Sequence, residues 1–278
     1  MAPSVRITVL VENRSAREDL ASEHGLSLWV EIDGFRLLFD TGQSGAFLSN
    51  ARALGVPVEK ADALVLSHGH YDHTGGLAAL PAEVGPHRLY LHPAAVVPRY
   101  SSAKPLLPRQ IGMPPQSVSA IERMNDQVVW TLKPTRISGR IGVTGAIPRK
   151  TSFEDVGGPF FLDPDCTRPD AILDDQAVWV ETQEGPVVLL GCAHAGVVNT
   201  LDYIASLTGV SRFHAVIGGM HLLNADKARL RTTADALERY DMAVLAPCHC
   251  TGDVAVDYFK GRFPEDLVCL AAGAMLEL

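Results

Sequence analysis

The ten residues from Ser67 to Gly76, SHGHYDHTGG, constrain this chain more than any other part of its sequence. They place three imidazoles, those of His68, His70 and His73, and the carboxylate of Asp72 within six positions. Imidazole nitrogens and carboxylate oxygens are good ligands for zinc and similar divalent ions. The glycines let the backbone turn tightly, so that successive side chains can face two different ions. The loop therefore predicts a metal site rather than a run of polar surface residues.

Three more histidines are candidates to complete this site, because a two-metal centre needs more donors than one loop supplies. His194, in GCAHAG, follows a predicted strand and precedes a predicted helix, where the active-site loops of sheet proteins gather. His249, in PCHCTG, also lies at a strand end, and we expect it to bind the same ion as Asp72 and His73. For His221, in GGMHL, the sequence leaves open a ligand, a catalytic or substrate contact, and a structural role.

Other residues near these loops have alternative roles that the sequence does not decide between. Cys248 and Cys250 flank His249 and are either thiolate ligands or buried apolar side chains. Asp40 ends a predicted strand and either accepts the free ring N–H of a metal-bound imidazole or simply begins a turn. His92, at the end of another strand, is expected to support the site or the fold rather than to bind an ion.

The histidine loop resembles that of the metallo-β-lactamase superfamily, because His68, His70, Asp72 and His73 match its His-x-His-x-Asp-His motif. The resemblance implies an α/β protein of the metallo-β-lactamase fold, a four-layered αββα sandwich. It further implies that His68 and His70 help to bind one metal ion, and Asp72 and His73 the other. The implied cofactor is zinc, as one or two ions, with other divalent metals as alternatives. Di-iron relatives typically have Glu at the position of His70 and a flavodoxin domain; this chain has neither, which favours hydrolysis.

A closer resemblance runs through nearly the whole chain. It is to the subfamily of 7,8-dihydropterin-6-ylmethyl-4-(β-D-ribofuranosyl)aminobenzene 5′-phosphate synthases, and its segments are LVEN (10–13), DDQA (174–177), GCAHAGVVNT (191–200), GGMHL (218–222) and PCHCTG (247–252). The chain departs from the wider superfamily at two points. Many members have another His before the second hairpin and an Asp at its end, where this chain has GVTG (142–145) and Gly191-Cys192. We expect His194 to fill one of these vacancies.

The order of predicted elements favours a single domain over residues 1–278, with an irregular insertion at about 93–158 that is rich in Pro, Gly and Ser. Asp33-Gly34 favours a type I′ hairpin. After a second hairpin, helices and strands alternate, which suggests stacked sheets with helices outside. The expected strands are 5–11, 27–32, 35–39, 63–67, 177–181, 186–190, 213–217, 242–246 and 267–270, and the expected helices are 46–54, 197–207, 225–240 and 254–263.

The distribution of charge bears on possible ligands. The net charge of −8 argues against nucleic-acid binding, which depends on basic side chains that neutralise phosphates. Between Arg99 and Lys150, however, nine basic residues stand against two acidic ones, so this segment is +7 and the remainder −15. A positive cleft concentrates anions. We therefore expect an anionic small molecule to bind at Arg136, Arg140 and Arg149, although scattered solvated charges would give the same count.

The sequence also bears on the location of the protein. Its five cysteines are dispersed, no export signal is visible at the N-terminus, and no apolar run approaches the roughly 20 residues that cross a bilayer. These features predict a cytoplasmic protein with reduced cysteines and no membrane partner. Oligomeric state has no signature in the sequence.

These patterns together lead to one expected activity and two alternatives. We expect a metal-bound hydroxide to hydrolyse an ester-type substrate carrying a phosphate, with Asp72 orienting the nucleophile and His221 assisting. The first alternative is a synthase-like transferase that joins a pterin to an aminobenzene ribosyl phosphate. The second is a non-catalytic ligand sensor that keeps the fold and the metal.

Overall fold

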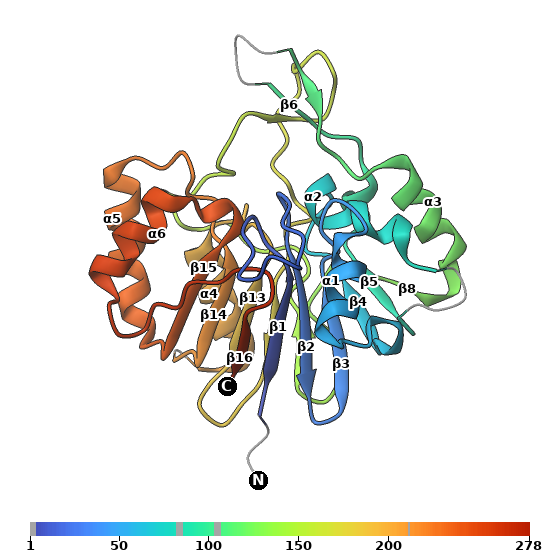
Figure 1. The fold of residues 1–278 in the computed structure, drawn as a ribbon. Coiled ribbons are helices and arrows are strands. Elements are labelled where there is room, and N and C mark those ends of the chain that lie inside the picture. Colours follow the sequence, from blue (N-terminus) through green and yellow to red (C-terminus); the bar gives the residue numbers. More distant parts are fainter. Residues whose placement is uncertain (1–3, 82–85, 103–106, 211) are drawn as a thin grey trace.

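The computed structural model describes residues 4–81, 86–102, 107–210 and 212–278. Two β-sheets pack face to face, and helices cover the outer face of each sheet (Figure 1). This arrangement confirms the four-layered αββα sandwich expected from the resemblance.

The first sheet has seven strands in the order β16-β1-β2-β3-β4-β5-β8. Its N-terminal half is antiparallel, and the turn between β2 and β3 has positive φ at both Asp33 (50°) and Gly34 (79°), as a type I′ hairpin requires. From β3 onward its strands are parallel. The bounds are β1 (Arg6–Val11), β2 (Ser27–Ile32), β3 (Phe35–Phe39), β4 (Ala63–Val65), β5 (Leu89–Leu91), β8 (Val128–Trp130) and β16 (Met275–Glu277).

The second sheet has six strands in the order β15-β14-β13-β12-β10-β9. Strands β13, β14 and β15 run parallel, so their carboxyl ends lie at one edge of the sheet. The bounds are β9 (Thr135–Arg136), β10 (Ile141–Val143), β12 (Val178–Val180), β13 (Val187–Leu190), β14 (Ala215–Gly219) and β15 (Val244–Cys248). Loops that leave parallel strands at one edge commonly form a binding site.

Three apolar clusters hold the layers together. The central one joins the sheets, with Val30 and Val65 from the first sheet and Val178 and Ile217 from the second. The two outer clusters lie between each sheet and its helices. Burial of each such aliphatic side chain stabilises the fold by about 1.5–3 kcal/mol. The helices are α1 (Ala46–Leu54), α2 (Tyr71–Thr74), α3 (Pro115–Arg123), α4 (Val197–Thr208), α5 (Lys227–Leu237) and α6 (Asp253–Arg262).

Two expectations about the elements need correction. The segment 93–158 is not wholly irregular, because it contains α3 and contributes β8 to the first sheet and β9 and β10 to the second. These strands have two or three residues each, too few to show a periodic pattern. The strand expected at 267–270 is reduced to one bridge between Leu267 and Leu245, while Leu270 is buried in the core without strand pairing. The last strand is instead β16.

A third, small sheet lies at the same end of the sandwich as the histidine loop, near the top of Figure 1. It pairs β11 (Phe160–Phe161), β6 (Tyr100–Ser101) and β7 (Arg109–Gln110). Among the residues described, no helix has the length and apolar character needed to cross a membrane.

Candidate metal centre

The histidine loop is held from beneath by a buried ion-pair network. Strand β4 leads into the loop, and the backbone N–H of Gly69 donates a hydrogen bond of 2.7 Å to Asp174 Oδ2. Arg99, only 1% exposed, pairs with Asp174 and, at 2.7 Å, with Asp170. A Cβ atom at Gly69 would lie 2.0 Å from the carbonyl oxygen of Ala95, so only glycine fits here. The path of the loop is therefore fixed independently of any bound ion.

Three imidazoles of the cluster have their Nδ1 atoms next to carbonyl or carboxylate oxygens. His73 Nδ1 lies 2.7 Å from Asp40 Oδ2, and His194 Nδ1 lies 2.8 Å from the carbonyl oxygen of Val156. His249 Nδ1 lies 3.0 Å from the Oδ1 of Asn13, whose Nδ2 donates to the backbone carbonyl of His249. Because each oxygen accepts a hydrogen bond, each Nδ1 carries a proton, and in the neutral ring Nε2 presents the lone pair.

The donor atoms of the cluster gather around two neighbouring points. Around the first, His68 Nε2 lies 3.0 Å from His70 Nδ1, and the buried His194 Nε2 has no hydrogen-bond partner among the described residues. Around the second, His249 Nε2 lies 3.2 Å from His73 Nε2 and 3.3 Å from Asp72 Oδ2.

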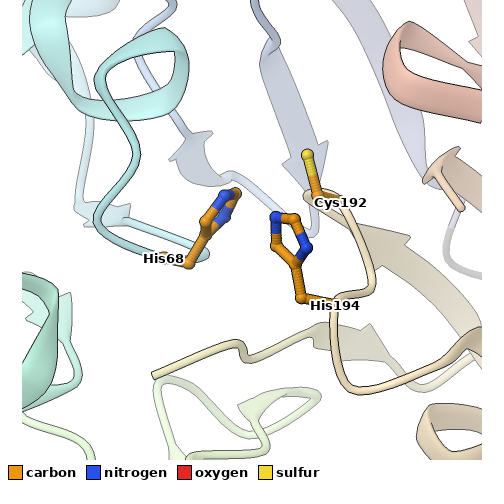
Figure 2. A group of neighbouring side chains, drawn as sticks. All are labelled: His68, Cys192 and His194. Atoms are coloured by element: carbon orange, nitrogen blue, oxygen red, sulfur yellow. The ribbon is translucent and has the colours of Figure 1, made fainter. Parts of the chain in front are cut away.

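Two imidazole lone pairs facing each other at 3.2 Å repel unless a proton or a cation lies between them. The imidazoles and the carboxylate are also ligands that zinc prefers. The donor set therefore fits divalent metal ions. Figure 2 shows one group of candidate donors, in which His68 and His194 face each other beside Cys192.

The electrostatics of the cluster keep His68, His70, His194 and Asp72 in the forms that bind a cation. Burial holds the pKa values of His68, His70 and His194 well below the usual range, so these rings are neutral at physiological pH. Burial also acts to raise the pKa of Asp72, but neighbouring imidazoles, His73 foremost, outweigh this and hold it well below its usual range. Neutral imidazoles and an ionised carboxylate are the forms that bind metal.

Sequence reasoning missed three contributors to this centre. Cys192, 2% exposed, places its Sγ 3.2 Å from His73 Nε2. Half-exposed His24 places its Nε2 3.2 Å from Asp72 Oδ2. Asn13 orients His249. Asn13 lies in LVEN and Cys192 in GCAHAG, two segments that carry the subfamily resemblance, and this was the available signal; His24 had none.

His221 and His92 lie in different environments. The ring of His221 stacks on His194 with 4.3 Å between centroids, and its buried Nδ1 has no partner among the described residues. His221 lies close enough to Cys192 and Cys250 for these three side chains to bind a metal ion together. His92 accepts a hydrogen bond from the N–H of Ala94 and caps a short helical turn, which is a structural role.

Four residues beside the cluster have left-handed backbone conformations that non-glycine residues seldom adopt. They are Asp40 (φ 58°), Ala193 (φ 52°), His221 (φ 46°) and His249 (φ 52°). Each lies within three residues of the carboxyl end of a strand. Such strained positions collect at functional sites, because the surrounding fold holds them there. Here they turn side chains from the strand ends toward the cluster.

A cavity of about 700 Å³ opens onto the cluster. Its walls include Asp72, His249 and the aromatic ring of Phe160 from the small sheet. The centroid of the Phe160 ring lies 5.3 Å from those of both His70 and His194. The small sheet therefore covers the donor cluster with an apolar surface while leaving the cavity open to one side.

The structure does not bring the three predicted anion-binding arginines together at this cavity. Arg136 pairs with Glu181 at 2.6 Å, and Arg140 pairs at 3.0 Å with Asp33, in the turn at the opposite end of the first sheet. Arg149 donates to the backbone carbonyl of His194 at 2.6 Å and so holds a ligand loop. Each of these arginines has a partner within the protein, which a local charge count does not reveal.

Comparisons with known proteins agree with this geometry. A family model described as the metallo-beta-lactamase superfamily matches residues 23–249. The chain is 28% identical to 7,8-dihydropterin-6-methyl-4-(beta-D-ribofuranosyl)-aminobenzene-5'-phosphate synthase of Methanocaldococcus jannaschii, over 99% of this chain and 97% of that protein. The crystal structure of Tm1679, described as a metal-dependent hydrolase of the beta-lactamase superfamily, is similar with a TM-score of 0.83 and 34% identity, over 99% of both chains. Zn²⁺-bound PqqB from Methylobacterium extorquens shares the fold, with a TM-score of 0.61 and 15% identity over 98% of this chain and 100% of that one.

Proposed function

Because this chain belongs to the metallo-β-lactamase superfamily, we propose that it is a metal-dependent hydrolase of an ester-type small molecule that carries a phosphate or similar anionic group. One observation supports this above all. Imidazole nitrogens and a carboxylate from separate loops converge with their lone pairs facing one another, beside an accessible cavity.

In this proposal, His68, His70 and His194 hold one divalent ion, and Asp72, His73 and His249 hold the second. Zinc is the ion that this donor set suits best. When bound, such ions lower the pKa of water to about 7 and polarise the bond to be cleaved.

The protein itself contributes orientation and exclusion of solvent. Asp40 and Asn13 hold a proton on Nδ1 of His73 and of His249, so that each ring, when neutral, presents its Nε2 lone pair. Asp72, on the cavity wall, is placed to orient the attacking nucleophile by accepting its hydrogen bond. Phe160 shields the cluster, which strengthens the electrostatic interactions inside.

In this proposal, Arg109 binds the anionic group of the substrate. Arg14 and Lys260 also line the cavity, but they pair with Asp253 and Asp257. The guanidinium of Arg109 lies over the ring of Tyr71, 5.6 Å from its centroid, and has no carboxylate partner within the described part of the chain. It is therefore available to a phosphate oxygen.

Activity is tested on protein stripped of metal and then reloaded with zinc. Esters, lactones and phosphate esters are offered in parallel, and product release is followed for wild type and for His73→Ala. Zinc-dependent turnover of at least one class, lost in the variant, supports the proposal. Bound zinc with no turnover of any class contradicts it.

The role of Arg109 is tested with Arg109→Met, which keeps an unbranched, flexible side chain and removes the charge. A hydrogen bond to a charged group contributes about 1.5–3 kcal/mol, so KM for phosphorylated substrates should rise about 10- to 100-fold. Arg136→Met, on the distant sheet edge, is the matched control and should leave KM unchanged. Equal behaviour of the two variants would remove Arg109 from the proposal.

A synthase-like transferase is a second candidate, favoured by the 28% identity to the M. jannaschii synthase over 99% of the chain. Such an enzyme would join a dihydropterin to a ribofuranosylaminobenzene phosphate. Metal-loaded protein is incubated with both compounds and the products are analysed by mass spectrometry. A coupled product identifies the transferase, whereas cleavage of the phosphate compound alone identifies the hydrolase.

A further inference from the structure

Cys192 occupies the point where the two sets of candidate ligands meet. It follows β13 directly, in Gly191-Cys192. Its side chain forms one candidate donor group with His68 and His194 and another with His73 and His249. In both groups all donor atoms lie within 4.8 Å of one another, and Cys192 is the member that the two groups share.

From this placement we infer that the Cys192 thiolate is a ligand shared by two metal ions. The inference rests on the metal-binding part of the proposed function but not on hydrolysis. Binding converts the thiol to a thiolate, and the proton leaves to solvent as the metal–sulfur bonds form. The thiolate then supplies the single negative charge that a carboxylate would supply, from a larger and softer atom.

The surrounding side chains support this assignment independently of the cysteine. The buried Nε2 of His194 belongs to the first donor group and has no hydrogen-bond partner in the described part of the chain. On the other side, His73 Nε2, whose ring is anchored through Nδ1 to Asp40, lies 3.2 Å from Cys192 Sγ. In Figure 2 the sulfur of Cys192 lies beside the facing rings of His68 and His194.

Two nearby cysteines provide comparisons within the same chain. Cys250 forms a donor group with Cys192 and His221, but it belongs to neither of the two imidazole pairs. Its Sγ lies 3.8 Å from the carbonyl oxygen of Cys192. Cys248 is buried in the apolar core between the sheets. The geometry therefore singles out Cys192 among three neighbouring thiols.

A shared thiolate has a consequence for metal choice. Thiolate ligands favour zinc and other soft or borderline ions, whereas carboxylate and water ligands suit magnesium and manganese. The centre should therefore prefer zinc and cobalt over manganese more strongly than a carboxylate-bridged centre would. Cys192→Asp should weaken that preference while retaining two bound ions.

The test begins with cobalt titrated into metal-free protein, because cobalt–thiolate bonds give a sulfur-to-metal charge-transfer band in the near ultraviolet. We expect the band in wild type, in Cys250→Ser and in Cys248→Ser, and its loss in Cys192→Ser. Cys192→Asp should bind two equivalents without the band. Persistence of the band in Cys192→Ser, or its loss in Cys250→Ser, would overturn the assignment.

X-ray absorption of the wild-type protein loaded with two zinc ions needs no variant and therefore does not depend on whether a variant folds. A shared thiolate gives, on average, one sulfur neighbour per zinc at about 2.3 Å. Half a sulfur per zinc, or none, would refute sharing. Failure of the wild type to bind zinc or cobalt would instead refute the metal centre itself, so the two failures are distinguishable.

Discussion

The fully buried carboxylate of Asp40 gives the sharpest prediction. Its Oδ1 accepts the backbone N–H of Ser67 at 2.7 Å, and its Oδ2 accepts from Ser67 Oγ and from His73 Nδ1, both at 2.7 Å. Asp40→Asn keeps the shape but must place an amide N–H₂ at one of these two oxygen positions. At the first it faces the Ser67 N–H. At the second it faces His73 Nδ1 and favours the tautomer with a proton on Nε2.

Either orientation has a measurable cost. Two buried donors facing each other cost about 1–3 kcal/mol of folding free energy. Loss of the group that orients a metal-binding imidazole typically lowers metal affinity 10- to 100-fold, or about 1.4–2.7 kcal/mol. The sum of the two losses in Asp40→Asn should therefore be at least about 1 kcal/mol.

Two assays measure these losses, namely competition for zinc with a chelator and urea unfolding of the metal-free protein. Asp62→Asn is the matched control, because Asp62 accepts the N–H of Arg36 at the opposite end of the same strands. It should leave zinc affinity unchanged. If Asp40→Asn kept both zinc affinity within twofold and stability within about 0.5 kcal/mol, a range usual for substitutions without structural effect, the reasoning would be wrong.

Three further predictions follow from the site and its support. Burial opposes protonation of His73, but Asp40 and Asp72 outweigh it and raise its pKa to about 9, so zinc must displace a proton below that pH. In Cys192→Ser, which has no thiol proton to release at that position, zinc affinity measured by chelator competition should thus rise about tenfold per pH unit from pH 7 and level off near pH 9. Arg99→Met leaves two buried carboxylates unpaired and should lower the free energy of urea unfolding by about 3–5 kcal/mol. Asn13→Ala should weaken binding of one of two zinc ions, seen as a shift of one calorimetric step while the other stays unchanged.

Each of these has a contrary outcome. A zinc affinity of Cys192→Ser that is independent of pH between 7 and 9 would show that His73 is not protonated in the metal-free protein. Unchanged unfolding of Arg99→Met would mean that the ion-pair network does not hold the loop. Equal weakening of both zinc ions in Asn13→Ala would contradict its specific contact with His249.

Local sequence patterns predicted much of the fold. The hairpin at Asp33-Gly34 and the helix 46–54 have the predicted bounds, because turn geometry and apolar spacing are local properties. The short strands β8, β9 and β10 escaped prediction, since their pairing depends on neighbours distant in the chain. The helix expected at 225–240 is shorter, Lys227–Leu237, and ends in a single 3₁₀ turn.

The histidines of the candidate site could be predicted from the sequence, because imidazoles at strand ends are typical metal ligands. His68, His73, His194 and His249 lie together as strand ends and glycine-rich loops suggested, although metal binding by them stays a prediction. The sequence could not show that Cys192 lies between them. That placement depends on the register of β13 beside β14, which only the three-dimensional fold determines.

Three parallel strands each end in a different loop of the centre, and this division has a consequence for how the chemistry can change. Insertion or deletion of a residue after β13, β14 or β15 would shift the donors of that loop and leave those of the other two loops in place. A change in one loop can therefore alter the metal ligands or the fit of the substrate without moving the other two loops. Different reactions can therefore evolve on this fold through changes in its loops, while the two sheets and their apolar core stay the same.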